Sequence, residues 1–307
     1  MSNSYKQYKN LVFEGGGVKG AAYAGVVDVL DQQGLLDPIE RVAGTSAGSM
    51  TAALLAIGSG STGLKESILN SDFNLFTKDS GWIIADLERL FKKFGVHSGK
   101  KFEEILKGFI NQYTGNPELT FAELEQKVYE EPNRYKHLAV VAANLSTQNN
   151  DVFDSERTPD IPIWKAVRCS MSIPFIFEPF VIQGNYYADG GLGWVYPIDI
   201  FDKKDEQGEA IINTETLGFY LLAESQIGHP GYMPVKTEIN SLKDASAAIF
   251  NFLINNSNAK HIHKKDMSRT VFISDLGFSA TDFNISRENI HRLIESGREA
   301  TMNFLNL

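Results

Sequence analysis

The residue best suited to chemistry is Ser46, which stands between Gly44 and Gly48 in a G-x-S-x-G sequence. Apolar runs at residues 39–43 and 46–57 indicate a strand before it and a helix after it. The small flanking residues permit a tight turn that places the hydroxyl above a sheet edge, and the helix directs its positive end there. This context predicts that Ser46 is a nucleophile; the alternative is a serine that only caps the helix.

A glycine-rich loop is expected directly after an earlier strand at residues 10–14. Consecutive glycines leave backbone N–H groups unobstructed at the start of a helix, where they can bind an anion. If Ser46 attacks an acyl ester, that anion is the oxygen of the tetrahedral intermediate. The loop reads GGGVKG, and its glycines are Gly15, Gly16, Gly17 and Gly20.

The same loop admits a second interpretation, as a dinucleotide-binding turn. Gly15, Gly17 and Gly20 also satisfy G-x-G-x-x-G, and Glu40 follows twenty residues later. The acidic residue that binds a ribose belongs at the end of the second strand, whereas Glu40 precedes the apolar part of that strand. Because G-x-S-x-G takes the place at the strand's end, the pattern favours acyl chemistry over nucleotide binding.

The third segment contains Asp189, which is followed by Gly190 and Gly191 and preceded by an apolar and aromatic run. An aspartate between a strand and two glycines lies on an open loop, from which its carboxylate can point into a cleft. Taken alone, Asp-Gly-Gly is typical of an ordinary turn. It becomes informative together with the two other segments.

The elements that carry these segments indicate an α/β fold. A strand, glycines, a helix at residues 20–31, a second strand and a second helix succeed one another over residues 10–57, which is typical of a parallel sheet with helices packed on it. We find no repeat and no linker, and we therefore expect a polar tail at residues 1–8 and a single domain over residues 9–307. Further elements are expected as strands at residues 136–145, 216–223 and 270–274, a hairpin at 180–188, and helices at 164–171 and the C-terminus.

The composition excludes several classes of protein. The net charge of −9 disfavours nucleic-acid binding, because a phosphate backbone attracts basic surfaces. Cys169 is the only cysteine, which excludes an intrachain disulfide and fits a reducing compartment. No apolar run approaches the roughly 18–20 residues that span a bilayer, and the first residues lack the apolar region of a secretory signal. We therefore expect a cytoplasmic protein, with peripheral membrane association or signal-independent secretion as alternatives.

In their order along the chain, GGGVKG, GTSAG and DGG resemble the motifs of the patatin-like phospholipases, in particular those of bacterial type. Residues 170–174 (SMSIP), with Phe177 and Pro179, are similar to the family's segment that leads up to the aspartate. The resemblance extends over about residues 9–200. It implies a three-layer α/β/α patatin-like sandwich with a mainly parallel central sheet.

The resemblance also implies roles for the site residues. Ser46 and Asp189 would form a Ser-Asp dyad, with Ser46 as the nucleophile and Asp189 as its base. The implied activity is hydrolysis of a lipid acyl ester through an acyl-enzyme, as in a phospholipase A or lysophospholipase; acyl transfer to an alcohol is the alternative. The oxyanion loop would consist of Gly15, Gly16 and Gly17. The supporting motif positions would be Lys19, where the family carries Arg or Lys, Gly20, Gly44, Gly48, Gly190 and Gly191.

The histidines provide a separate test of a dyad. A Ser-His-Asp triad needs a histidine between the serine and the acid, yet none of the six histidines stands in a glycine-framed loop after an expected strand. Asp189 would then accept the proton itself, although an aspartate with the usual pKa of about 3.9 is a weak base. Burial in an apolar cleft would strengthen it. The six are His97, His137, His229, His261, His263 and His291.

The expected partner is a lipid or another acyl-ester substrate, and no metal or organic cofactor is implied. His261 and His263 have no acidic or cysteine partner at ligand spacing. Residues 245–254 are apolar and are expected to pack in the core, with a cleft wall, a lid or an interfacial helix as alternatives. The basic residues 260–269 are expected to form a solvated face, with contact to anionic headgroups at a membrane surface as the alternative. The sequence indicates no oligomeric state.

Overall fold

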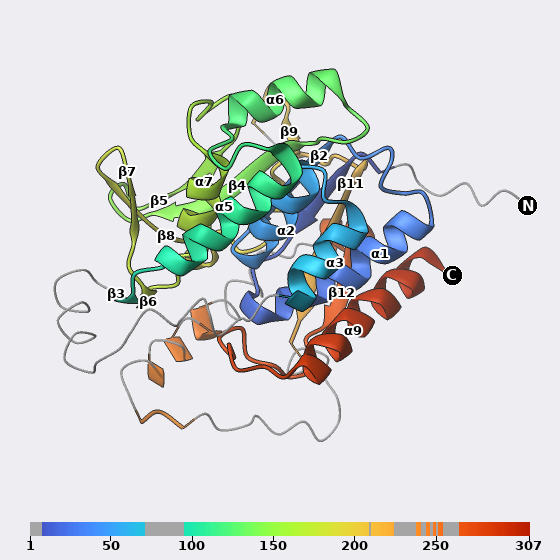
Figure 1. Ribbon diagram of the computed structural model, residues 1–307. Coiled ribbons are helices and arrows are strands. Elements are labelled where there is room, and N and C mark those ends of the chain that lie inside the picture. Colours follow the sequence, from blue (N-terminus) through green and yellow to red (C-terminus); the bar gives the residue numbers. More distant parts are fainter. Residues whose placement is uncertain are drawn as a thin grey trace, which may run out of the picture.

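The computed structural model describes residues 8–70, 95–208, 210–223, 238–240, 244–245, 248–249, 251–253 and 264–307. Within them an eight-stranded sheet has the order β12-β11-β1-β2-β4-β8-β7, with β5 paired to β4 (Figure 1). Its strands are β1 (Asn10–Phe13), β2 (Arg41–Thr45), β4 (His137–Asn144), β5 (Asn149–Phe153), β7 (Phe180–Ile182), β8 (Asn185–Asp189), β11 (Thr216–Leu222) and β12 (Thr270–Ser274). Two small sheets pair β3 (Gly95–His97) with β6 (Phe175–Phe177) and β9 (Lys203–Lys204) with β10 (Ala210–Ile211).

The centre of the main sheet is parallel. Strands β12, β11, β1, β2 and β4 pair in parallel, whereas β5, β7 and β8 join in antiparallel pairs. All four residues of β1 and most residues of β2 and β11 are buried. Strands of this kind are expected where a parallel sheet is covered on both faces. The expected α/β class with a mainly parallel central sheet is confirmed.

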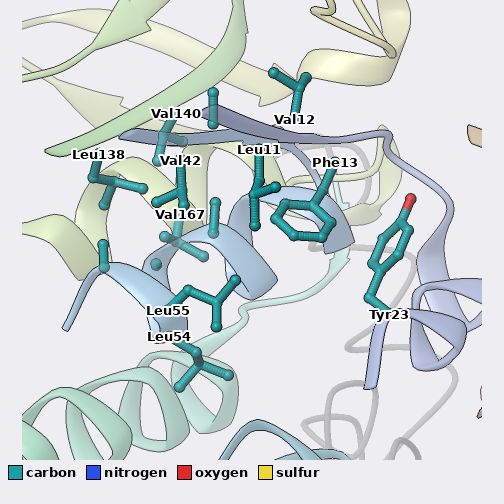
Figure 2. Close-up of a cluster of buried hydrophobic side chains, with 14 of the residues drawn as sticks. Leu11, Val12, Phe13, Tyr23, Val42, Leu54, Leu55, Leu138, Val140 and Val167 are labelled. Carbon is teal, nitrogen blue, oxygen red and sulfur yellow. The ribbon is translucent and has the colours of Figure 1, made fainter. Parts of the chain in front are cut away.

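Helices pack on one face of the sheet. Helix α2 contacts β1, β2 and β4, helix α7 contacts β4 and β8, and helix α9 contacts α1 and β12. Phe13 of β1 points toward this face, where its ring meets Tyr23 of α1 edge-on at 5.1 Å between centroids (Figure 2). Within the described residues, the helices include α1 (Tyr23–Gln32), α2 (Ala47–Ala56), α3 (Gly60–Asn70), α5 (Lys100–Thr114), α6 (Phe121–Glu130), α7 (Ile163–Ser170) and α9 (Arg287–Leu305), and the short 3-10 helices include η1 (Gly17–Ala22), η3 (Gly190–Leu192) and η5 (Lys264–Arg269).

The chain that follows β8 covers part of the opposite face. Val12 of β1 points to this side, away from Phe13 (Figure 2). Tyr196 and Ile198 lie directly against β11, because a Cβ at Gly218 would come within 1.9 Å of Tyr196 Oη and 2.5 Å of Ile198 Cδ1. The sheet is therefore covered on both sides here, which accounts for the apolar character of β1 on both faces.

Strands β2 and β8 meet end to end along one edge of β4. Strand β5 pairs with residues 140–144 of β4 and so takes one of its edges. Strand β2 pairs with residues 137–141 and β8 with residues 142–144, which places both on the other edge. Because β2 runs parallel to β4 and β8 antiparallel, their carboxyl ends, Thr45 and Asp189, face each other. The residue that follows β2 therefore lies next to the last residue of β8.

Some expectations require correction. The first helix, expected from residue 20, starts as the 3-10 helix η1, in which Lys19 N–H donates to Gly16 O, and α1 begins only at Tyr23. Of the apolar residues 245–254, Ile249, Phe252 and Leu253 are exposed, so the prediction of core packing is wrong for these three. In the part of the chain that the structure describes, no helix has the length and apolar character needed to cross a membrane.

Candidate active site

Ser46 lies in the sharp turn between β2 and α2. Its φ of 51° and ψ of −125° are unusual for a residue other than glycine, and backbone angles of this kind cost about 1–3 kcal/mol. The turn packs α2 tightly against the sheet: a Cβ at Gly48 would lie 2.3 Å from Phe13 O, and one at Gly44 would lie 2.3 Å from Gly48 O. Close backbone approach therefore explains both glycines of G-x-S-x-G, and the turn holds Ser46 at the N-terminus of α2.

The carboxylate of Asp189 accepts a hydrogen bond directly from the hydroxyl of Ser46. Ser46 Oγ donates to Asp189 Oδ2 at 2.6 Å, although 143 positions separate the two residues. The second carboxylate oxygen, Oδ1, accepts the N–H of Gly191 at 2.8 Å. Ser46 is 2% exposed and Asp189 is fully buried. The serine and the aspartate of the two sequence motifs thus form one buried hydrogen-bonded pair.

The environment of Asp189 makes its carboxylate a stronger base. Burial raises the pKa of Asp189 from 3.8 to about 7, against the smaller lowering influence of the hydrogen bonds from Ser46 and Gly191. Removal from water disfavours the charged form, and neither bond cancels that effect. A carboxylate with this pKa can accept a proton near neutral pH, which an ordinary aspartate does poorly.

The glycine loop lies beside Ser46, and its three successive glycines differ in their hydrogen bonds. Gly15 N–H donates to Val195 O at 2.9 Å, so it is already used inside the fold, and the role of oxyanion donor that we expected for Gly15 requires correction. Among the hydrogen bonds between described residues, none engages the N–H of Gly16 or Gly17. Gly17 has a φ of 56°, in the left-handed region. Gly16 and Gly17 are therefore the loop's candidates for binding an anion.

The remaining motif glycines fill narrow places around the pair. A Cβ at Gly20 would lie 2.8 Å from that of Ala47, and a Cβ at Gly190 would lie 2.6 Å from Val141 O. Gly191 contributes its N–H to Asp189. These positions support the turn and the aspartate through packing and backbone contacts.

Lys19 connects the glycine loop to the end of β12. Its Nζ lies 3.1 Å from Asp275 Oδ2, and both side chains are 5% exposed. Two further contacts tie the loop to the same region: Val18 N–H donates to Ala280 O at 3.0 Å, and a Cβ at Gly17 would meet Ala280 O at 1.9 Å. Lys19 thus fixes the position of the loop through an ion pair with Asp275.

An apolar cleft opens beside Ser46. Ser46 and Gly17 line this cleft, together with side chains from α2, α3 and α5 and from the chain around β6. Such a cleft suits a hydrocarbon chain, because burial of apolar surface provides the main driving force for binding it. Its apolar lining includes Met50, Leu54, Leu64, Ile68, Phe102 and Phe177.

Among the hydrogen bonds between described residues, none joins a histidine to Ser46 or Asp189. His97 is buried in β3 beside the ring of Phe177, His137 contacts Glu125 at 2.9 Å, and His291 lies exposed on α9. His229, His261 and His263 lie outside the described residues. Within the described ranges, no three His, Cys, Asp or Glu side chains gather as they would around a metal ion.

Glu40, the acid required by the dinucleotide interpretation, precedes β2 and pairs with Lys9 at 3.1 Å. The glycine loop instead follows the carboxyl end of β1, which runs parallel to β2. Glu40 and the loop therefore lie at opposite ends of these strands. This separation disfavours dinucleotide binding.

The fold and the site define an α/β protein with a buried serine and aspartate, a glycine loop and an apolar cleft. The sequence model of the patatin-like phospholipase family matches residues 11–202, and this span contains all three motifs. The chain belongs to the patatin-like phospholipase family. Membership supports the function of a lipid hydrolase.

The chain is also similar to individual proteins and to solved structures. An uncharacterized protein of Acanthamoeba polyphaga mimivirus is 29% identical over 298 residues, which cover 96% of this chain and 92% of the relative. A probable lipid hydrolase of Invertebrate iridescent virus 6 is 32% identical over 200 residues, 64% of this chain and 63% of the relative. The crystal structure of VipD from Legionella pneumophila matches with a TM-score of 0.62 and 19% identity over 98% of this chain and 67% of VipD. This likeness confirms the patatin-like α/β fold.

Sequence reasoning missed most of the cleft. Leu64 and Ile68 lie one helical turn apart on α3, and Phe102 lies on α5. The helical spacing of apolar residues could have identified these faces as buried. It could not have shown that they face Ser46, because contacts between distant helices set the position of the cleft.

Proposed function

We propose that this protein is a serine lipid acyl hydrolase of the phospholipase A or lysophospholipase type, with Ser46 as the nucleophile and Asp189 as its base. The observation that carries the proposal is the 2.6 Å hydrogen bond from Ser46 Oγ to the buried Asp189. A pKa of about 7 for Asp189 suits this task. Serine is a weak nucleophile unless an adjacent base takes its proton.

The first half of the reaction transfers the acyl group to the protein. Ser46 Oγ attacks the ester carbonyl while its proton passes to Asp189 Oδ2. The N–H groups of Gly16 and Gly17 and the N-terminus of α2 stabilise the negative oxygen of the tetrahedral intermediate. Asp189 then returns the proton to the leaving alcohol, which leaves an ester on Ser46.

The second half regenerates the serine. A water molecule attacks the acyl-enzyme, Asp189 takes its proton, and the fatty acid departs as Ser46 recovers its hydrogen. The acyl chain occupies the apolar cleft during both steps, since the lining of the cleft is almost entirely apolar and reaches Ser46. The name of the iridescent virus relative, a probable lipid hydrolase, agrees with this substrate class.

The test combines covalent labelling with product analysis. A fluorophosphonate should label the wild type at Ser46, because activated serines attack such probes, and the Ser46→Ala variant should remain unlabelled. Incubation with mixed phospholipids and lysophospholipids should release free fatty acid, detected by mass spectrometry. Acylated alcohols in place of free fatty acid would instead identify an acyltransferase. Labelling of another serine, with Ser46→Ala still hydrolytic, would overturn the assignment.

A further inference from the structure

The turn formed by residues 168–172, at the C-terminal end of α7, contacts the backbone of both Ser46 and Asp189. Ser170, the last residue of α7, is fully buried. Its Oγ accepts the N–H of Ser46 at 2.8 Å and donates to Val141 O at 2.5 Å. Val141 is the residue of β4 that pairs with Thr45, the last residue of β2. The Ser170 hydroxyl therefore bridges β4 and the turn that carries Ser46.

The buried backbone N–H of Ser46 needs a hydrogen-bond acceptor. A buried N–H without an acceptor is costly, and the positive φ of Ser46 means that its turn is held by its surroundings. On the carbonyl side, Ser46 O accepts the N–H and the hydroxyl of Ser49 at 2.8 and 2.6 Å. On the amide side, the partner is Ser170. The orientation of the Ser46 side chain toward Asp189 thus depends on a hydroxyl from another element.

The same turn holds the peptide of Asp189. Asp189 N–H donates to Ser172 O at 2.8 Å. The Ser172 hydroxyl bonds twice to Arg168, accepting from Nη1 at 2.5 Å and donating to the carbonyl oxygen at 2.7 Å. Arg168 is 1% exposed, and its Nη2 also donates to Ser98 O and Glu178 O. A buried arginine therefore stabilises the segment that places the aspartate.

We propose that Ser170 is a positioning residue for the Ser46–Asp189 pair, and that the turn formed by residues 168–172 sets the distance between the two side chains. The inference rests on the proposed function, since it concerns the same attacking serine. Ser170 touches no reacting atom in this scheme. It acts by holding the peptide of Ser46, because a displacement of about 1 Å at a reacting group can reduce the rate about 100-fold.

The experiment removes the hydroxyl in two ways and compares it with a remote hydroxyl. Ser170→Ala deletes it, and Ser170→Cys keeps the approximate shape with a much weaker acceptor. The control is Thr301→Val, which removes a fully buried hydroxyl that donates to Gly297 O at 2.8 Å within α9. For each protein, kcat, KM, the rate of fluorophosphonate labelling and the pH dependence of kcat are measured on folded material, as checked by circular dichroism.

Both Ser170 variants should lower kcat and the labelling rate about 10- to 100-fold with KM changed less than about twofold. The acidic limb of the pH profile should move to higher pH. The hydrogen bond from Ser46 lowers the pKa of Asp189, so a weaker bond leaves that pKa higher. Thr301→Val should match the wild type in every measurement. If the wild type is active and the Ser170 variants have the same kcat, labelling rate and acidic limb as the wild type, the positioning role is overturned and the proposed function is not. A wild type that neither labels nor hydrolyses lipid would overturn the proposed function as well.

Discussion

Asp189 is a carboxyl group whose burial changes both its chemistry and its contribution to stability. In the unfolded chain its pKa is near 3.8, whereas in the folded protein burial raises the pKa to about 7. Between these two values the folded state binds one proton more than the unfolded state. The extra proton on Asp189 therefore contributes fully to the free energy of unfolding below about pH 4, and this contribution is lost as the pH rises through about 7.

We predict that Asp189→Asn removes this pH dependence. Relative to the wild type, the free energy of unfolding of the variant should rise by about 1.4 kcal/mol per pH unit between about pH 4 and pH 7. An asparagine can keep the contacts, with its oxygen accepting Gly191 N–H and its amide donating to Ser46 Oγ. Urea unfolding at pH 5, 6, 7 and 8 measures the difference. The exposed Asp160→Asn is the control, and parallel curves for wild type and Asp189→Asn would contradict the raised pKa.

The motifs identified the two residues whose side chains meet, but they did not reveal how the neighbours serve them. Ser46 and Asp189 stand out in sequence because glycines flank the serine on both sides and follow the aspartate. The partner of Lys19 is Asp275, 256 positions away, and Ser170 reaches Ser46 across 124 positions. Nothing in the local pattern around a lysine or serine encodes such contacts, because the packing of several elements creates them. The hydrogen bond that occupies Gly15 N–H was unpredictable for the same reason.

At the scale of elements, the glycine loop and the loop after β12 form one packed unit. Gly17 occupies the left-handed region, and its Cα faces Ala280 O so closely that a Cβ would lie 1.9 Å away. A side chain there adds backbone strain and also pushes the loop away from Ala280. The displacement would move the N–H groups proposed to bind the oxyanion.

We predict that Gly17→Ala lowers kcat about 100- to 1000-fold, the usual effect of losing one oxyanion donor. Binding of substrate should change little, because these donors act chiefly on the transition state. The matched control is Gly34→Ala: Gly34 also has a left-handed φ, 65°, but no atom lies within 4 Å of its ideal Cβ. It bears the same backbone strain without a displaced loop. Steady-state kinetics with equal kcat for both variants would place the oxyanion donors elsewhere.

Most elements could be predicted from apolar runs and glycine breaks, whereas their arrangement could not. The runs at residues 136–145 and 270–274 became β4 and β12 within one residue at each end. Strand β5 was not expected, since its sequence NNDVF is polar and only Phe153 is buried. The end-to-end meeting of β2 and β8 also escaped prediction. It arises from the register of both strands on β4, which a single strand's sequence does not encode.

At the scale of the molecule, the last strands complete the sheet that the first strand begins. Strands β11 and β12 lie beyond residue 202, where the family match ends, yet β11 pairs directly with β1. Arg269, at the end of η5, joins the two regions by donating to both carboxylate oxygens of Asp202, each at 2.6 Å. It also donates to Asp266 of the same helix at 2.6 Å. We infer from these contacts that the chain unfolds as a single cooperative unit.

The final prediction concerns this buried ion cluster. Arg269→Met leaves Asp202 and Asp266, 4% and 2% exposed, without their cation. Breaking a buried pair in this way costs about 3–5 kcal/mol. The same change at the surface, Lys9→Met, breaks a pair with side chains 38% and 55% exposed and should cost less than about 1 kcal/mol. Tryptophan fluorescence and circular dichroism during urea unfolding measure both costs.

For Arg269→Met, the two probes should shift together to lower urea, because damage beyond residue 202 destabilises the whole sheet. Below the transition, kcat should remain within about twofold of the wild type. Arg269 immediately precedes β12, which runs parallel to the strands whose carboxyl ends carry the glycine loop and Ser46; it therefore lies at the other end of the sheet. Separate fluorescence and dichroism transitions in the wild type or in this variant would show that the C-terminal strands form an independent unit, contrary to a single domain.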